Sequence, residues 1–211
     1  MKTTLPIVLL FALTVWAADP PNLDTFKGCG LDGVASSACG KKLDRLKNRY
    51  APASGINPQI TIAAILAPGD DTTRWKTSDA AEITGYVASV EPGGFEESCN
   101  CKRADLQDIH INVVGDPKDA GKGPRTLIVE ITPREQFLHK QWTLAWAQQN
   151  LTHKWVRFTG WMLFDAMHSA ESDHTKAKPQ QCGSIKVHEI WRATAWEIHP
   201  VTDLQVLPKK P

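Results

Sequence analysis

The sequence predicts a mainly β fold: a five-stranded Greek-key barrel with one helix between its third and fourth strands. Two observations lead to this class. Segments with the period-two alternation of half-buried strands come as a group of three and a later pair, and a strongly capped helical segment separates the groups. We expect the barrel domain to span residues 81–207, after an N-terminal extension over residues 18–80 that carries a short helix. An open antiparallel α+β sheet is the main alternative.

Period-two alternation is clearest in the second of the five expected strands. There Ile109, Ile111 and Val113 occupy every second position, so they share one face of the strand. Glycines at positions 85 and 160 fall inside two other strands, where a small barrel needs its strands to bend. The last strand is expected to end at Pro200. The five expected strands are residues 82–90, 107–115, 125–132, 155–168 and 191–201.

The helix that separates the strands is expected over residues 132–150. Thr132 is a typical N-cap residue, and Glu135 completes a Thr-x-x-Glu capping box. Trp142 and Trp146 then recur at helical spacing and belong to its apolar face.

One helix and one further strand are expected within the extension. Leu43, Leu46 and Tyr50 recur at helical spacing, which predicts a short helix within residues 36–50. The apolar run of residues 60–66 is long enough for one strand.

Residues 1–17 have the pattern of a secretory signal peptide. Lys2 gives a positive start, an apolar core runs from Leu5 to Trp16, and Ala17 ends a small-residue cleavage site. An uncleaved membrane anchor is the alternative, but the apolar core is shorter than the ~20 residues that span a bilayer. Because no later segment is as apolar for as long, we expect no transmembrane segment after the signal peptide. The mature protein should be exported, to the periplasm or the extracellular space.

The charge of the chain argues against general binding of nucleic acids. Of the 24 basic residues, Lys2 would leave with the signal peptide, and the others would balance the 23 acidic residues. Nucleic-acid binding draws much of its affinity from lysine and arginine at phosphates, and this chain has no basic run. A small ligand, a glycan or another protein is the expected partner.

Five cysteines would remain in the exported chain. Disulfides are the default in an oxidising compartment, with one thiol left over. The favoured pairing joins Cys29 to Cys39, and joins either Cys99 or Cys101 to Cys182, although spacing alone does not decide it. The alternative is a zinc site made of Cys99, Cys101, Cys182 and a histidine, but structural zinc sites usually show paired C-x-x-C spacing.

The order of three strands, one helix and two strands resembles that of the OB-fold, a five-stranded barrel. A second resemblance covers residues 82–206 and rests on short motifs. These are Asp108-x-His110, Glu130 before a Thr-Pro helix start, the string T-G-x-x-x-F-D-x-x-H ending at His168, and the string E-I-H-P-V starting at Glu197. They are similar to the motifs of a family of bacterial secreted proteins without an assigned function, although Pro133 follows Glu130 one residue later than in that family. The resemblance therefore implies no particular reaction.

Three acid–histidine pairs and one further acid are the candidate functional residues: Asp108 with His110, Asp165 with His168, Glu197 with His199, and Glu130. Residues two apart on a strand share a face, so the first and third pairs each present both side chains together. A hairpin of the second and third strands would place Glu130 opposite His110. Because the third strand of an OB barrel also borders the fifth, Glu130 would lie between these two pairs.

This expected cluster has the composition of a metal site. Imidazole and carboxylate are common ligands of zinc and manganese, and the expected ligands are His110, His199, Asp108 and Glu130. Without a metal, a histidine oriented by a carboxylate can act as a general base. The alternative is that these side chains make ordinary polar contacts on the strand faces.

Trp161 and Trp191 are the candidate ligand-binding aromatics, because OB-fold proteins stack bases or sugars on aromatic side chains. The insertion at residues 169–189 is long for a loop and joins the last two strands, where OB proteins often bind ligands.

The leading expectation is a secreted ligand-binding domain whose ligand is unknown. One alternative is a metal-assisted hydrolase of esters or phosphodiesters, in which Asp165 or His168 assists. Another is an envelope protein whose barrel contacts other proteins and whose polar pairs are structural. The sequence leaves open whether the protein is an enzyme.

Overall fold

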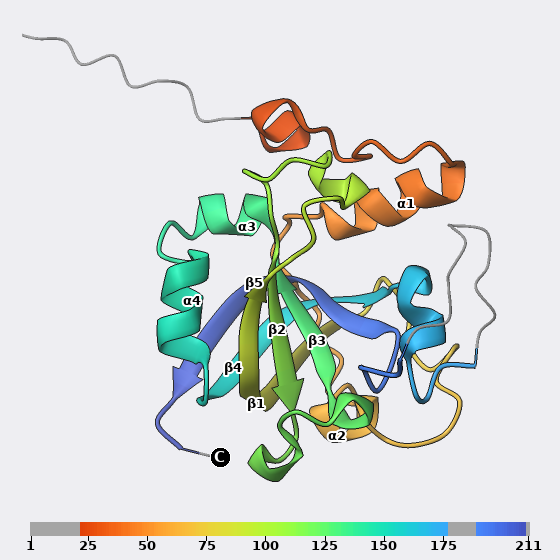
Figure 1. The fold of residues 1–211 in the computed structure, drawn as a ribbon, viewed down its shortest axis with the longest axis vertical. Helices are drawn as coiled ribbons and strands as arrows, with labels where there is room; N and C mark the ends of the chain where they lie inside the picture. Colours follow the sequence, from red (N-terminus) through yellow and green to blue (C-terminus); the bar gives the residue numbers. More distant parts are fainter. Residues whose placement is uncertain (1–21, 177–188, 210–211) are drawn as a thin grey trace, which may run out of the picture.

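A computed structural model describes residues 22–176 and 189–209 of the chain (Figure 1). The predicted fold class is confirmed within these residues, since five strands form a closed barrel in the order β1-β2-β3-β5-β4. The strands are β1 (Ala80–Pro92), β2 (Ile109–Val114), β3 (Leu127–Ile131), β4 (Trp155–Phe164) and β5 (Trp196–Leu207).

The pairing of the strands is that of the OB-fold. β3 and β5 are parallel, whereas the other neighbouring strands of the barrel are antiparallel. The expected register of β2 and β3 is confirmed, because His110 pairs with Glu130 and Ile111 with Val129. This register points Ile109, Ile111 and Val113 of β2 into the barrel and leaves His110 and Asn112 on its outer face.

The interior of the barrel is apolar. All five strands contribute side chains that are no more than 1% exposed, among them Ile83, Ile111, Val129, Phe158 and Ile198. Because successive side chains alternate between the two faces, His110, Glu130, Glu197 and His199 lie on the outer face of neighbouring strands. Burial of the apolar face is the main force that holds these strands together.

Gly160 lies where the pairing of β4 and β5 is irregular. A Cβ at this position would lie 2.6 Å from Ile198 Cγ2 and would also meet the carbonyl oxygen of Pro200. β5 passes this point and continues to Leu207, so the expected end of the strand at Pro200 is wrong. Proline is tolerated here because the ladder of hydrogen bonds is already interrupted.

Two short helices, α3 (Pro133–Leu138) and α4 (Leu144–Leu151), stand where one helix was expected. Thr132 caps α3 as predicted, its hydroxyl accepting a hydrogen bond from the backbone N–H three residues on. Thr143 caps α4 in the same way. This second cap ends the expected single helix, because a threonine side chain that bonds the following turn favours a new helix start.

The extension contains the 3₁₀ helix η1 (Leu23–Gly28) and the helices α1 (Ala38–Lys47) and α2 (Ile62–Ile65). α1 confirms the helix expected there. α2 replaces the expected strand, because the Thr61 hydroxyl caps it and the helical turn buries Ile65. α1 lies across the end of the barrel at which β1 ends and β2 begins (Figure 1). Within the described parts of the chain, no helix is both long and apolar enough to cross a membrane.

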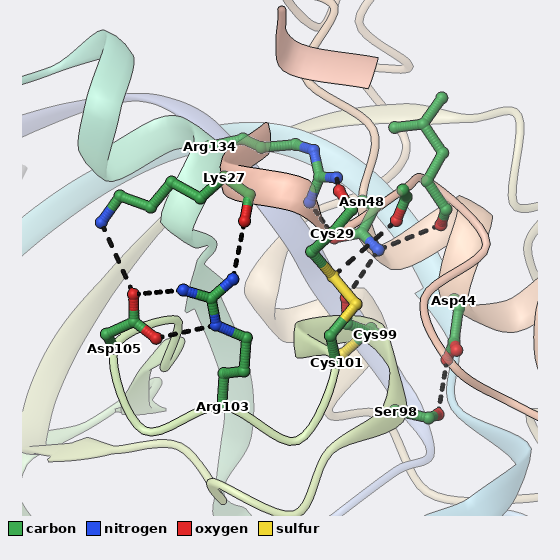
Figure 2. The surroundings of a disulfide bond; sticks show 12 residues. Lys27, Cys29, Asp44, Asn48, Ser98, Cys99, Cys101, Arg103, Asp105 and Arg134 are labelled. Carbon is green, nitrogen blue, oxygen red and sulfur yellow. Dashed lines mark hydrogen bonds and ion pairs between the residues drawn. A yellow bond between two sulfur atoms is a disulfide. The ribbon is translucent and has the colours of Figure 1, made fainter. Parts of the chain in front are cut away.

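A disulfide between Cys29 and Cys101, 72 residues apart, joins the extension to the β1–β2 connection (Figure 2). The expected pairing of Cys29 with Cys39 is therefore wrong, because the extension folds back over the barrel and brings Cys29 to this connection. Cys39 also takes part in a disulfide, and Cys99 is a buried free thiol. The expected link from Cys99 or Cys101 to Cys182 and a zinc site using Cys101 are thereby excluded. Cys182 itself lies outside the described residues.

Arg134 of α3 links the disulfide to the end of α1. Its guanidinium donates to the carbonyl oxygen of Cys29 at 2.8 Å and to Asn48 Oδ1 at 2.5 Å. The Asn48 amide donates in turn to the carbonyl oxygen of Cys99 at 2.9 Å (Figure 2). Because buried polar groups are costly unless they are hydrogen-bonded, this set of bonds fixes the extension against the barrel.

Candidate functional site

Two histidines share one glutamate on the outer face of β2, β3 and β5. His110 Nε2 lies 3.1 Å from Glu130 Oε1, and His199 Nδ1 lies 3.0 Å from Glu130 Oε2. Three strands that are not all neighbours in sequence supply these side chains, so the barrel itself sets their spacing. The predicted placement of Glu130 between the two histidines is confirmed.

On the β5 side the contacts continue to a buried arginine. His199 Nδ1 lies 3.3 Å from Glu197 Oε2, and Arg192 Nη2 lies 2.7 Å from Glu197 Oε1. Arg192 and Glu197 are both almost fully buried. The arginine thus compensates the charge of a carboxylate that would otherwise be costly to bury.

On the β2 side the contacts reach the extension. His110 Nε2 lies 3.6 Å from Glu97 Oε1, and Lys47 Nζ lies 3.8 Å from Glu97 Oε2 and 2.7 Å from Asp165 Oδ2. We call the eight residues of this chain of contacts the charge network. They are Arg192, Glu197, His199, Glu130, His110, Glu97, Lys47 and Asp165.

The charge network holds both histidines in the protonated form. Burial lowers the pKa of His110, but the Glu130 carboxylate beside it outweighs burial and raises this pKa to about 11. Burial also lowers the pKa of His199, but the Glu130 and Glu197 carboxylates outweigh burial and raise this pKa to about 10. Burial raises the pKa of Glu130, and the two imidazolium groups reverse this and bring it well below its usual value. Positive and negative groups therefore alternate along the network at neutral pH.

Asp108 precedes β2 and lies beside the charge network. Its Oδ2 accepts a hydrogen bond from Asn100 Nδ2 at 3.0 Å. Burial, together with the Glu97 and Glu130 carboxylates, raises its pKa to about 7. Among the described residues, its Oδ1 atom and His199 Nε2 are buried without a hydrogen-bond partner.

Three groups of side chains in this region have the spacing and chemistry to hold a metal ion. Each side chain of a group offers one ligand atom within 4.8 Å of the others. The groups are Glu97/Cys99/Asp108, Glu97/His110/Glu130 and Asp108/Glu130/His199. All four of the expected metal ligands belong to at least one of them.

The charge network opens into a cleft of about 860 Å³. α1, the β1–β2 connection and the segment that follows β4 form its walls. Side chains of both charges and one indole line it, including Lys47, Glu97, His110, Asp165, His168 and Trp191. His110 and Glu97 are the members of the network that reach solvent most, with 25% and 21% of their side chains exposed.

On one wall of the cleft, Glu171 holds a histidine. His168 Nδ1 lies 2.6 Å from Glu171 Oε2, and Trp191 Nε1 donates to the same oxygen at 2.8 Å. The expected pair of Asp165 and His168 is thus replaced by two separate pairs, because Asp165 turns to Lys47. Since the Glu171 carboxylate oxygen accepts the hydrogen bond, His168 Nδ1 donates it. Nε2 is then the ring nitrogen that does not contact Glu171.

All but one of the sequence-based candidates fall into two sets. Asp108, His110, Glu130, Glu197 and His199 gather around the charge network, and Asp165 is its last member. His168 and Trp191 belong to the cleft wall. Trp161 lies outside the cleft lining, where its indole N–H donates to the carbonyl oxygen of Ala51 at 2.8 Å.

Sequence reasoning did not name Lys47 and Glu97 as candidates, nor Arg192 of the charge network and Glu171 of the cleft wall. Lys47 is on the helix of the extension, and Glu97 is in the irregular connection between β1 and β2. Neither belongs to a strand with period-two alternation, so no pattern assigned them to the face that carries the histidines.

The fold and the site together define an OB-like barrel with a charged cleft on its outer face. Comparisons with protein-family models, with curated proteins and with solved structures each give no match for this chain. The resemblance to a family of secreted bacterial proteins therefore stays a prediction.

Proposed function

We propose that the protein binds a small polar ligand, such as a glycan fragment, in the cleft. The observation that carries this proposal is the connection of a cleft of about 860 Å³ to ionised side chains of both signs. Pockets of this volume suit small molecules, and a few convergent polar groups give them specificity. The cleft remains a candidate for binding whether or not the protein is an enzyme.

The lining of the cleft favours a ligand that both donates and accepts hydrogen bonds. Lys47 and His110 offer donors, whereas Glu97 offers an acceptor, and the fully buried Asp165 holds Lys47 from behind. Sugar hydroxyls can satisfy both kinds of group, and the Trp191 ring adds an apolar surface at the wall. A purely cationic ligand would meet repulsion from Lys47 and His110, and a purely anionic ligand from Glu97.

A glycan array probed with the mature chain, followed by calorimetry with the best ligand, tests this proposal. The two tryptophans are tested separately. Trp191→Ala should weaken binding about 10-fold or more, because it removes an aromatic contact at the cleft wall. Trp161→Ala should leave binding unchanged. Loss of ligand affinity in Trp161→Ala alone would place the ligand on the outer face of β4. Equal affinity in both variants would refute binding in the cleft.

Hydrolysis of an ester or phosphodiester is the second candidate function. The observation in its favour is the His168–Glu171 pair, because a histidine held at Nδ1 by a carboxylate can use Nε2 as a general base. His168→Gln should then lower turnover of a responsive ester or phosphodiester by ~100-fold. His139→Gln, which changes a histidine outside the cleft lining, is the matched control. The third expectation, an envelope protein that contacts other proteins, stays a prediction.

We also propose that the protein is exported. The Cys29–Cys101 disulfide supports this, because disulfides persist in oxidising compartments. The expected signal peptide, residues 1–17, lies outside the described residues. N-terminal sequencing of the protein recovered from the expressing cells' exported fraction should begin directly after Ala17. Recovery of an intact N-terminus from the cytosol would contradict export.

A further inference from the structure

We infer that Asp108, Glu130 and His199 form a binding site for one divalent transition-metal ion. Each of the three offers an oxygen or nitrogen atom within 4.8 Å of the atoms offered by the other two. One imidazole and two carboxylates make a donor set suited to manganese or zinc. The inference goes beyond the ligand proposed for the cleft, since an ion could bind here with the cleft empty.

Two unpartnered atoms point to this site independently of the clustering of acids. Asp108 is 1% exposed, and its Oδ1 has no hydrogen-bond partner among the described residues, although Asn100 holds Oδ2. His199 is 0% exposed, and its Nε2 is likewise without a partner in the described part of the chain. Buried polar atoms are rarely left unsatisfied, and one ion between these two atoms would satisfy both.

The surroundings of His199 resemble those of a metal-bound histidine. Its Nδ1 is held by Glu130 and Glu197, and Arg192 in turn fixes Glu197 at 2.7 Å. A carboxylate on one ring nitrogen orients the imidazole and leaves the other nitrogen for a metal. An ion bound to Asp108 Oδ1 and His199 Nε2 would break no hydrogen bond that the protein already makes, and its binding would release the Nε2 proton of the imidazolium.

The other two groups fit an ion less well. In Glu97/His110/Glu130, the His110 Nε2 atom already forms ion pairs with both carboxylates, at 3.6 Å and 3.1 Å, and an ion on this nitrogen would have to replace both. In Glu97/Cys99/Asp108, the thiol already donates to Glu97 at 3.5 Å and would have to lose its proton in a buried place. Asp108/Glu130/His199 combines unpartnered atoms with an imidazole.

Metal content measured by mass spectrometry tests the site directly. The mature full-length chain is stripped with a chelator, incubated with manganese or zinc in excess, and desalted. We expect about one equivalent of bound ion per chain, and at least ~10-fold less in Asp108→Asn and in His199→Gln. Wild-type protein that takes up no ion would overturn the inference.

Asp71→Asn is the matched control. Asp71 is 1% exposed like Asp108, and it too has one oxygen that accepts a side-chain hydrogen bond, from Thr175, and one without a partner. It belongs to none of the three groups of potential ligands among the described residues. Asp71→Asn should therefore keep the ion. Equal uptake by Asp108→Asn and Asp71→Asn would overturn the inference.

Cobalt titration of the wild-type chain keeps the test decisive if the variants fail to fold. Cobalt bound by imidazole and carboxylate should give only weak visible bands. An intense near-ultraviolet band from sulfur-to-cobalt charge transfer would place the ion on Cys99 and overturn the assignment. Because no cleft ligand is present, this result does not depend on whether the cleft binds a glycan.

Discussion

Lys47 Nζ lies 2.7 Å from Asp165 Oδ2, with 10% of the lysine side chain and none of the aspartate side chain exposed. This ion pair joins α1 of the extension to the residue that follows β4. The Asp165 carboxylate outweighs the effect of burial and raises the pKa of Lys47 well above its usual value. Both groups therefore stay charged in a place that water scarcely reaches.

Breaking this pair from one side should be strongly destabilising. Lys47→Met leaves the Asp165 carboxylate buried without its cation, and we expect a loss of about 3–5 kcal/mol in the free energy of unfolding. Urea denaturation measures the loss. The double variant Lys47→Met/Asp165→Leu should recover a large part of it, because no buried charge is then left unpaired. A single variant within about 1 kcal/mol of wild type would contradict this role.

The Cys29–Cys101 disulfide should contribute substantially to stability. It closes a long loop, 72 residues in sequence separation, and so restricts the unfolded chain. We expect the Cys29→Ser/Cys101→Ser variant to lose about 2–5 kcal/mol in guanidinium denaturation. Cys99→Ala is the control, since it removes a buried thiol and leaves the disulfide in place. If the two variants unfold at the same denaturant concentration, the disulfide has no special effect.

Gly160 should be needed for the crossing of β4 and β5. Gly160→Ala would push a methyl group against Ile198 and the backbone of Pro200, which should cost about 1–3 kcal/mol. Gly30→Ala is the matched control, because a Cβ at Gly30 would have no atom within 4 Å. Thermal unfolding of both variants provides the comparison. A Gly160→Ala variant as stable as Gly30→Ala would show that the two strands can separate without cost.

Glu135 should make the protein less stable as the pH rises. Burial raises its pKa from 4.5 to about 8, so the folded state keeps the proton that the unfolded state loses above pH 4.5. Stability from this group is therefore lost between about pH 4.5 and 8. His139 is the titratable group that faces Glu135, with 3.6 Å between its Nε2 and Glu135 Oε2.

Urea denaturation at several pH values should show this loss by comparison with Glu135→Gln. The glutamine side chain cannot ionise. The free energy of unfolding of the variant, relative to that of the wild type, should therefore rise by up to about 4 kcal/mol between pH 5 and 8. His139→Gln should keep the wild-type dependence on pH. Parallel curves for Glu135→Gln and wild type would mean that Glu135 ionises freely in the folded protein.

The strands and the facing of His110 and Glu130 could be predicted because they follow from alternation alone. A period of two fixes the face of each side chain, and one apolar pair, Ile111 with Val129, then fixes the register. The division of the long helix into α3 and α4 could also have been expected from Thr143, a second N-cap residue within it.

The partners supplied by irregular segments could not be predicted. Lys47, Glu97 and Arg192 reach the strands from a helix of the extension and from connections, and their placement depends on how the whole chain folds over the barrel. The same holds for Cys29 and Cys101. Short sequence separation favoured Cys39 as the partner of Cys29, whereas the folded extension brings the more distant cysteine alongside.

Glu130 divides its two oxygens between His110 and His199, which limits how this protein can change during evolution. A single mutation that removed the carboxylate would leave a partly buried cation, His110, and a fully buried one, His199, with no shared counter-charge. Such an intermediate would be selected against, so the three positions should be inherited together. Natural sequences that lack the glutamate are expected to have replaced at least one of the two histidines as well.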